Sequence, residues 1–226
     1  MAGLVDRSRR PNRIPERTPP VVEERVVALR REHPAWGGRK IHARLRALGL
    51  STAPSPSTIT AILRRHGMLE PTKSSQHRPW QRFEHPEPND LWQMDFKGHI
   101  PTESGRCHPL TILDDHSRFS LGLQACGDER GDTVRERLIP IFRRYGLPRR
   151  ILVDNGRPWG DSGGRPYTRF TVWLLRLSIA VSHGRAFHRQ TQGNDERFHR
   201  TLVAEVIAGR TFADLTACQF SFDRWR

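Results

Sequence analysis

The sequence lacks a long apolar run, and this excludes two classes of protein. No stretch approaches the ~18 residues that a membrane-spanning helix needs, and the N-terminus has no apolar core of a secretory signal. Cysteine is scarce too: Cys107, Cys126 and Cys218 lie far apart and form no Cys-x-x-Cys pair. This pattern supports neither a disulfide framework nor a zinc site, and it fits a reducing cytoplasm.

Lysine is nearly absent, because 35 of the 38 basic residues are arginine. The formal net charge is nevertheless +14, since only 24 residues are acidic. Such a surplus indicates a polyanionic partner, most often nucleic acid. Residues 1–88 carry a net +9 and residues 89–226 a net +5, so we expect the N-terminal part to make most of the electrostatic contact with DNA. The arginine excess itself fits either codon usage in a G+C-rich genome or phosphate recognition.

The N-terminal third has helical patterns only. A basic, proline-rich arm covers residues 1–19, and three short helices are expected over about 20–31, over 38–48, and from Ser57, the expected N-cap, to Gly67. A compact three-helix unit over residues 20–69 is typical of a helix-turn-helix, whose last helix enters the major groove of DNA. A plain helical subdomain is the alternative.

In the third helix, Ile59, Ile62 and Leu63 are expected to face inward. The residues predicted to contact DNA from this unit are Arg39, Lys40, Thr60, Arg64 and Arg65.

An α/β pattern follows a linker predicted over residues 70–90, in which Trp80 and Phe83 are candidates for docking. Strands are expected in the segments LWQMDFKGHI, PLTILDD, FSLGLQAC, RRILVDNG and IAVSHG, and helices in DTVRERLIPIFRRYG and over about 168–177 and 191–207. This order predicts an α/β domain with a mixed five-stranded sheet and flanking helices over residues 91–209. A last helix is expected over 210–226.

Two of these strands carry acidic residues where ligands collect in open α/β sheets. Asp95 lies between Met94 and Phe96, and a carboxylate in apolar company is costly unless it is paired or binds a cation. Asp154 ends the strand RRILVD, and Glu196 lies on a later helix. Three carboxylates converging on one edge suit Mg²⁺ or Mn²⁺, and two such ions stabilise both oxygens of an in-line displacement at phosphorus.

Each carboxylate also has an ordinary interpretation, as a strand-end cap, a turn residue or a solvated helix residue. His199 and Arg200 are predicted to contact DNA phosphate beside the metals, although Glu196 and Arg200 also stand at the spacing of an intrahelical ion pair. Asp114 and Asp115 are expected to shape a turn.

The segments WQMDFKG, LTILDDHSRF, ILVDNG and QTQGNDERFHRTL resemble the integrase-core (DDE-type) transposases of bacterial insertion sequences, which are relatives of retroviral integrases. The resemblance implies a ribonuclease-H-like fold after a helix-turn-helix-like domain. It also implies that Asp95, Asp154 and Glu196 are the catalytic, metal-binding triad, that the cofactor is Mg²⁺, and that the partner is double-stranded DNA. The expected activity is DNA 3′-end cleavage and strand transfer by a homo-oligomer in the bacterial cytoplasm.

The sequence departs from the family pattern in places. Forty-one residues separate Asp154 from Glu196, more than is usual, and Asn194 stands where relatives often have lysine. Both ends lack segments that relatives carry, so we expect a truncated chain that binds DNA without completing transposition. A ribonuclease-H-like nuclease and a catalytically incompetent DNA-binding remnant are the alternatives, since fold and triad alone do not fix the substrate.

Overall fold

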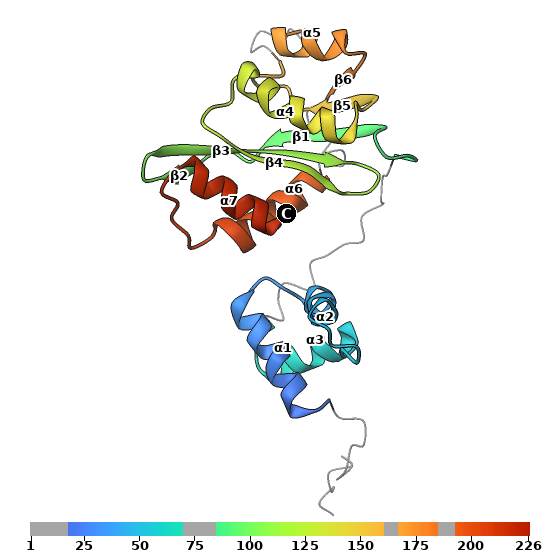
Figure 1. The fold of residues 1–226 in the computed structure, drawn as a ribbon, viewed down its shortest axis with the longest axis vertical. Helices are drawn as coiled ribbons and strands as arrows, with labels where there is room; N and C mark the ends of the chain where they lie inside the picture. Colours follow the sequence, from blue (N-terminus) through green and yellow to red (C-terminus); the bar gives the residue numbers. More distant parts are fainter. Residues whose placement is uncertain (1–17, 70–84, 161–166, 185–192) are drawn as a thin grey trace, which may run out of the picture. The chain divides into compact units, whose positions relative to one another are not determined.

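The computed structural model describes residues 18–69, 85–160, 167–184 and 193–226. It divides into a helical unit within residues 1–78 and an α/β unit within residues 79–226 (Figure 1). Among the described residues, no helix is both long and apolar enough to cross a membrane.

Three helices pack around a small apolar core in the helical unit. α1 runs over Pro20–Glu32, α2 over Gly38–Ala47 and α3 over Pro56–Arg65. The inward positions recur every three or four residues, and the buried set is Val26, Val27, Leu29, Ile41, Leu45, Ile59, Ile62 and Leu63. The three expected helices and the inward face of α3 are confirmed.

The start of α3 differs from the expected one. Ser55 is the N-cap, because its Oγ accepts a hydrogen bond from the Thr58 N–H at 3.2 Å. Pro56 supplies the first helical residue, where a missing N–H costs nothing. The prediction of Ser57 as the cap is therefore wrong, and the helix begins before it.

α2 approaches α3 closely at Gly38. A Cβ there would clash with the backbone oxygen of Pro56 and with the hydroxyl of Thr60. Since a backbone atom is part of the obstacle, we expect Gly38→Ala to destabilise the helical unit by about 2 kcal/mol. Gly37→Ala is the matched control, because a Cβ at Gly37 meets nothing within 4 Å. Amide hydrogen exchange of α2 and α3 in the full chain measures the effect, and equal exchange in both variants would contradict it.

Six strands form one mixed sheet in the α/β unit. They are β1 (Leu91–Phe96), β2 (Ile100–Thr102), β3 (Gly105–Asp114), β4 (Ser120–Cys126), β5 (Arg150–Val153) and β6 (Ala180–His183). β1 pairs antiparallel with β3 and parallel with β5, while β4 lies beyond β3 and β6 beyond β5. The order β4-β3-β1-β5-β6 is the expected mixed five-stranded sheet, with β1 in the middle.

β2 is the addition to the expected sheet. One strand was predicted over residues 91–100, but Gly98 has a φ of 88°, a left-handed conformation that interrupts a strand. Pairing resumes where Ile100 meets Cys107, so β3 begins at Gly105 rather than at Pro109.

Helices cover both faces of the sheet (Figure 1). α4 (Gly131–Tyr145) and α5 (Arg169–Arg176) lie on one face, over a core that includes Trp92, Ile112 and Ile151. α6 (Gly193–Leu202), the π-helical turn η2 (Val203–Ile207) and α7 (Leu215–Trp225) lie on the other face, over a core that includes Leu123 and Phe222.

The last two helical segments differ in detail from the expected ones. The helix expected over 191–207 is α-helical only to Leu202 and continues as η2. The helix expected over 210–226 begins at Leu215, because Asp214 caps it by accepting the Ala217 N–H at 2.8 Å.

The segment 85–90, predicted as the end of the linker, lies against the sheet. The His85 N–H donates to Asp115 Oδ2 at 3.0 Å, and the Asn89 N–H donates to Asp114 Oδ1 at 2.9 Å. The Arg149 N–H donates to the Asn89 carbonyl at 2.8 Å. The expected docking residues Trp80 and Phe83 lie outside the described part of the chain.

Candidate active site

The alternation of β1 places its polar residues on the α6 side of the sheet. Trp92 and Met94 belong to the core under α4 and α5, so Gln93 and Asp95 point to the opposite face. The parallel register pairs Gln93 with Leu152. Two residues further along, the same register brings Asp95 beside Asp154. The two carboxylates therefore share one edge and one face, as the sequence pattern predicted.

The turn after β5 fixes Asp154. Its Oδ1 accepts the Gly156 N–H at 2.9 Å, and its carbonyl accepts Nδ1–H of His183 at 2.9 Å. Asn155 donates through Nδ2 to the Gly184 carbonyl at 2.9 Å. The Asp-Asn-Gly sequence thus joins the ends of β5 and β6, while Oδ2 of Asp154 stays out of the turn bond.

Burial is the main electrostatic influence on Asp95. Burial, and after it the neighbouring Asp154 carboxylate, raise the pKa of this carboxyl to about 7. Glu129 acts in the same direction, whereas Lys97, just beyond the end of β1, opposes it. Two half-buried carboxylates that repel each other are a fitting donor set for a hard divalent cation, which removes the repulsion and supplies the missing charge.

α6 presents Asp195, not Glu196, to the sheet. Asp195 is 3% exposed, and its Oδ1 has no hydrogen-bond partner among the described residues. Burial first, and then the Asp95 and Asp115 carboxylates, hold the pKa of Asp195 well above its ordinary value. Glu196 is exposed one position along the helix. Within the described ranges, no three acidic, histidine or cysteine side chains gather closely enough to hold an ion together.

His199 faces the sheet, which does not agree with its predicted contact to DNA phosphate. The residue is 7% exposed, and its Nε2 lies 2.9 Å from Thr111 Oγ1. Burial lowers the pKa of His199 to about 4, with a smaller effect from Lys97, so the ring is neutral at pH 7. Its helical phase, set by buried Leu202 and Val206, turns it inward. Arg200, the other residue predicted to contact phosphate here, is exposed.

Asp114 and Asp115 shape the β3–β4 turn, as expected. Asp114 Oδ2 accepts the N–H and the hydroxyl of Ser117, at 2.8 and 2.6 Å. Asp115 Oδ1 accepts Gln93 Nε2 at 2.6 Å and Arg118 Nη1 at 2.7 Å. Their lone pairs are committed to structure, so neither belongs to the candidate metal site.

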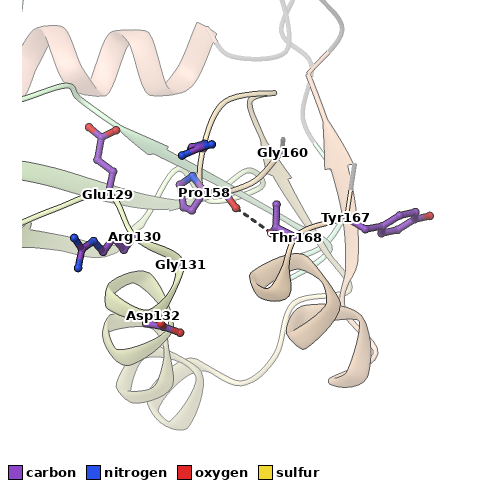
Figure 2. Close-up of a pocket in the computed structure, with 9 residues that line it drawn as sticks. Glu129, Arg130, Gly131, Asp132, Pro158, Gly160, Tyr167 and Thr168 are labelled. Atoms are coloured by element: carbon purple, nitrogen blue, oxygen red, sulfur yellow. Dashed lines mark hydrogen bonds between the residues drawn. The ribbon is translucent and has the colours of Figure 1, made fainter. Parts of the chain in front are cut away.

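A hollow of about 510 Å³ lies between the starts of α4 and α5 (Figure 2). Its charged lining residues are Glu129, Arg130, Asp132 and Arg157, which balance in sign. Glu129 connects it to the site, because this carboxylate acts on Asp95 and pairs with His108 Nδ1 at 2.8 Å. With no net charge, the hollow does not by itself select an anionic ligand.

The five residues predicted to contact DNA from the helical unit fall into two groups. Arg39, Lys40 and Arg64 are exposed. Thr60 is half-buried at the α2–α3 contact, where its hydroxyl donates to the Pro56 carbonyl at 2.7 Å. Arg65 Nη2 binds Glu23 Oε2 at 2.8 Å, which ties α3 to α1. The predicted DNA contact of Thr60 thus falls on a residue that is half-buried and bonded within α3.

Several residues of the site carried no signal in the sequence. Thr111 is brought opposite Asp95 by strand register, which a single sequence does not reveal. Asp195 looks like a solvated helix residue until the phase of α6 is known. Lys97 could have been predicted from the sequence, because strand alternation puts it on the same face as Asp95.

Comparison with known proteins gives matches over both units of the chain. Residues 85–188 match the family model of the integrase core domain, and residues 1–63 match that of a homeodomain-like domain. The Gag-Pol polyprotein of avian reticuloendotheliosis virus is 27% identical over 122 residues, which make up 54% of this chain and 10% of that protein.

Two solved structures are similar. The simian T-cell lymphotropic virus intasome in complex with PP2A regulatory subunit B56 gamma has a TM-score of 0.50 at 14% identity, covering 87% of this chain and 64% of that chain. The HTLV-2 integrase catalytic core domain in complex with magnesium has a TM-score of 0.40 at 18% identity, covering 50% and 66%. This chain thus spans a tenth of the polyprotein and less than two thirds of either solved chain.

The chain is thus similar to an integrase core domain over residues 85–188 and to a homeodomain-like domain over residues 1–63. Its α/β unit has the ribonuclease-H-like fold that the sequence resemblance implied.

Proposed function

We propose that this protein is the transposase of a bacterial insertion sequence and that it cleaves and joins DNA in the cytoplasm. The observation that carries the proposal is the placement of Asp95 and Asp154 on adjacent parallel strands, at one edge and on one face of the sheet. Glu196 on α6, exposed beside buried Asp195, completes the set of proposed catalytic carboxylates.

The proposed chemistry is phosphoryl transfer in two steps. Water first attacks phosphorus at the element end, the bond from phosphorus to the 3′ oxygen breaks, and that oxygen takes a proton. The freed 3′-OH then attacks a phosphodiester of the target and displaces its 3′ oxygen. Such reactions ask the protein mainly for positioning and charge stabilisation.

Asp95, Asp154 and Glu196 would hold the divalent metal, Mg²⁺ or Mn²⁺, in two copies. The bound ions supply charge stabilisation to the attacking and leaving oxygens. The chain's own contribution is to hold Asp154 in its turn through Gly156 and to keep α6 against the sheet through the contact of buried His199 with Thr111 of β3.

DNA is held in this proposal by the helical unit and by Arg200, and copies of the chain assemble on paired element ends. A ribonuclease-H-like nuclease with the same carboxylates is the second candidate function, because these carboxylates alone do not select the substrate. A non-catalytic DNA-binding remnant is the third.

A strand-transfer assay with labelled element ends, Mg²⁺ or Mn²⁺ and a target plasmid separates the three candidates. A transposase joins the labelled 3′ ends to the target. Cleavage without joining would identify a nuclease, and binding without either reaction would identify a remnant.

Adjacent arginines of α3 test the helix-turn-helix part of the proposal. We expect Arg64→Ala to weaken duplex DNA binding and to reduce the log–log salt slope by about 0.9, the effect of one lost phosphate contact. Arg65→Ala is the matched comparison, since Arg65 already binds Glu23. It should alter the stability of the helical unit more than DNA binding. Salt-dependent fluorescence anisotropy measures both, and an unchanged slope in Arg64→Ala would remove that residue from the interface.

A further inference from the structure

A row of contacts runs from His199 on α6 through Thr111 on β3 to Asp95. Thr111 lies opposite Asp95 in the β1–β3 register, and its Oγ1 donates to the Asp95 carbonyl at 3.0 Å. The same Oγ1 lies 2.9 Å from His199 Nε2. On the other side of the ring, Nδ1 lies 4.0 Å from Asp95 Oδ2. Because the ring is 7% exposed, solvent contributes little to either nitrogen.

The hydrogen bonds select one tautomer of His199. Thr111 has one hydroxyl proton, and the bond to the Asp95 carbonyl uses it. Its oxygen therefore accepts from the ring, and the single proton of neutral imidazole lies on Nε2. Nδ1 is left with a lone pair that faces a carboxylate oxygen. Two acceptors that face each other, one buried and one half-buried, are unfavourable unless a proton or a metal ion lies between them.

The separation of those two atoms suits a shared metal ion. At metal–ligand distances of about 2.1 Å, two ligands of one octahedral ion lie about 3.0 Å apart when adjacent and about 4.2 Å apart when opposite. The observed 4.0 Å is close to the separation of two opposite ligands. Histidines that bind metal also donate their second ring N–H to a fixed acceptor, and Thr111 Oγ1 is that acceptor here.

We infer that His199 is a metal ligand, binding through Nδ1 to an ion that it shares with Asp95. The inference rests on the metal-dependent site of the proposed function and adds a nitrogen donor to a set of carboxylates. An imidazole nitrogen binds first-row transition ions better than it binds Mg²⁺, whereas a carboxylate binds both kinds of ion well. The site consequently favours Mn²⁺ over Mg²⁺, and His199 is the residue that sets this preference.

The first experiment uses the full chain with Mn²⁺ and no DNA. Electron spin echo envelope modulation of bound Mn²⁺ should show a directly coordinated ¹⁴N, replaced by a ¹⁵N signal when histidine is ¹⁵N-labelled. The nitrogen signal should vanish in His199→Asn, with Mn²⁺ affinity lowered about tenfold or more and Mg²⁺ affinity lowered less. His183→Asn is the matched control, because His183 also lies beside the site, bound to the Asp154 carbonyl.

Absence of the nitrogen signal in the wild type, or its loss in His183→Asn rather than in His199→Asn, would overturn the inference. Circular dichroism checks the fold of each variant. Should His199→Asn fail to fold, the labelled wild type and His183→Asn still decide. The ring ¹⁵N shifts of the metal-free protein give a second reading, since a His199 proton on Nδ1 would contradict the assigned tautomer.

Mn²⁺ affinity in Asp154→Asn distinguishes failure of the proposed function from failure of this inference. Mn²⁺ affinity that is unchanged in Asp154→Asn would contradict the carboxylate metal site and the inference with it. Affinity that depends on Asp154 in a protein without the nitrogen signal would leave the carboxylate site standing and reject His199 alone.

Discussion

We expect Asp95→Asn, Asp154→Asn and Glu196→Gln each to reduce the proposed metal-dependent DNA cleavage about a thousandfold or more, which corresponds to a loss of roughly 4 kcal/mol of transition-state stabilisation. Each change removes a ligand charge and almost no volume. Duplex DNA binding, which we assign to the helical unit, stays unchanged in all three. Cleavage of labelled element ends and anisotropy with the same DNA measure the two properties.

Glu136→Gln is the control for these variants. Glu136 is an exposed carboxylate of α4, on the face of the sheet opposite α6. It should cleave like the wild type. A Glu196→Gln protein with wild-type cleavage would show that the exposed position of Glu196 excludes it from the site.

Asp195→Val stabilises the metal-free protein by roughly 2 kcal/mol at pH 7, because it removes a buried polar group whose Oδ1 has no partner among the described residues. Thermal and denaturant unfolding measure the change. Glu196→Gln, one residue along the same helix but exposed, should stay within about 0.5 kcal/mol of the wild type.

The pH dependence of the free energy of unfolding follows from the carboxyl groups of Asp95 and Asp195. A carboxyl whose pKa is higher in the folded than in the unfolded state holds its proton more tightly when folded. Its contribution is therefore fully present below the unfolded pKa and is lost as pH rises towards the folded one. For Asp95 this window runs from its ordinary pKa of 3.8 to about 7. For Asp195 it begins at the same ordinary pKa of 3.8 and extends upward.

Asp195→Val should accordingly lose less stability between pH 4 and pH 7 than the wild type does. The Asp95 contribution remains in the variant, so a smaller slope of the same sign is expected. Equal slopes in the two proteins would show that Asp195 finds a partner in solution.

The strands and the first two carboxylates were predictable because the signals are local. Apolar runs that end in an acidic residue identify β1 and β5, and parallel strands bring such ends together. Gly98 was the exception, since a single left-handed residue is enough to split a strand that hydropathy reads as continuous.

The surroundings of the site were not predictable, because they depend on register and helix phase. The predicted outward face of α6 rested on the spacing of Glu196 and Arg200, both of which are exposed. Nothing in that spacing shows that polar Asp195 and His199 lie on the buried face with Leu202. An amphipathic pattern in a single sequence does not predict which polar residues are buried.

The hydrogen bonds that hold residues 85–89 against the sheet have a mechanical consequence. Tension arriving along the chain from its N-terminal side loads the bonds from His85 and Asn89 to Asp115 and Asp114. The bond from the Arg149 N–H to the Asn89 carbonyl shares that load with the start of β5. The force is thus passed to the β3–β4 turn and to β5 before it reaches β1. The strand that carries Asp95 is thus shielded from peeling when the chain is pulled from its N-terminal side.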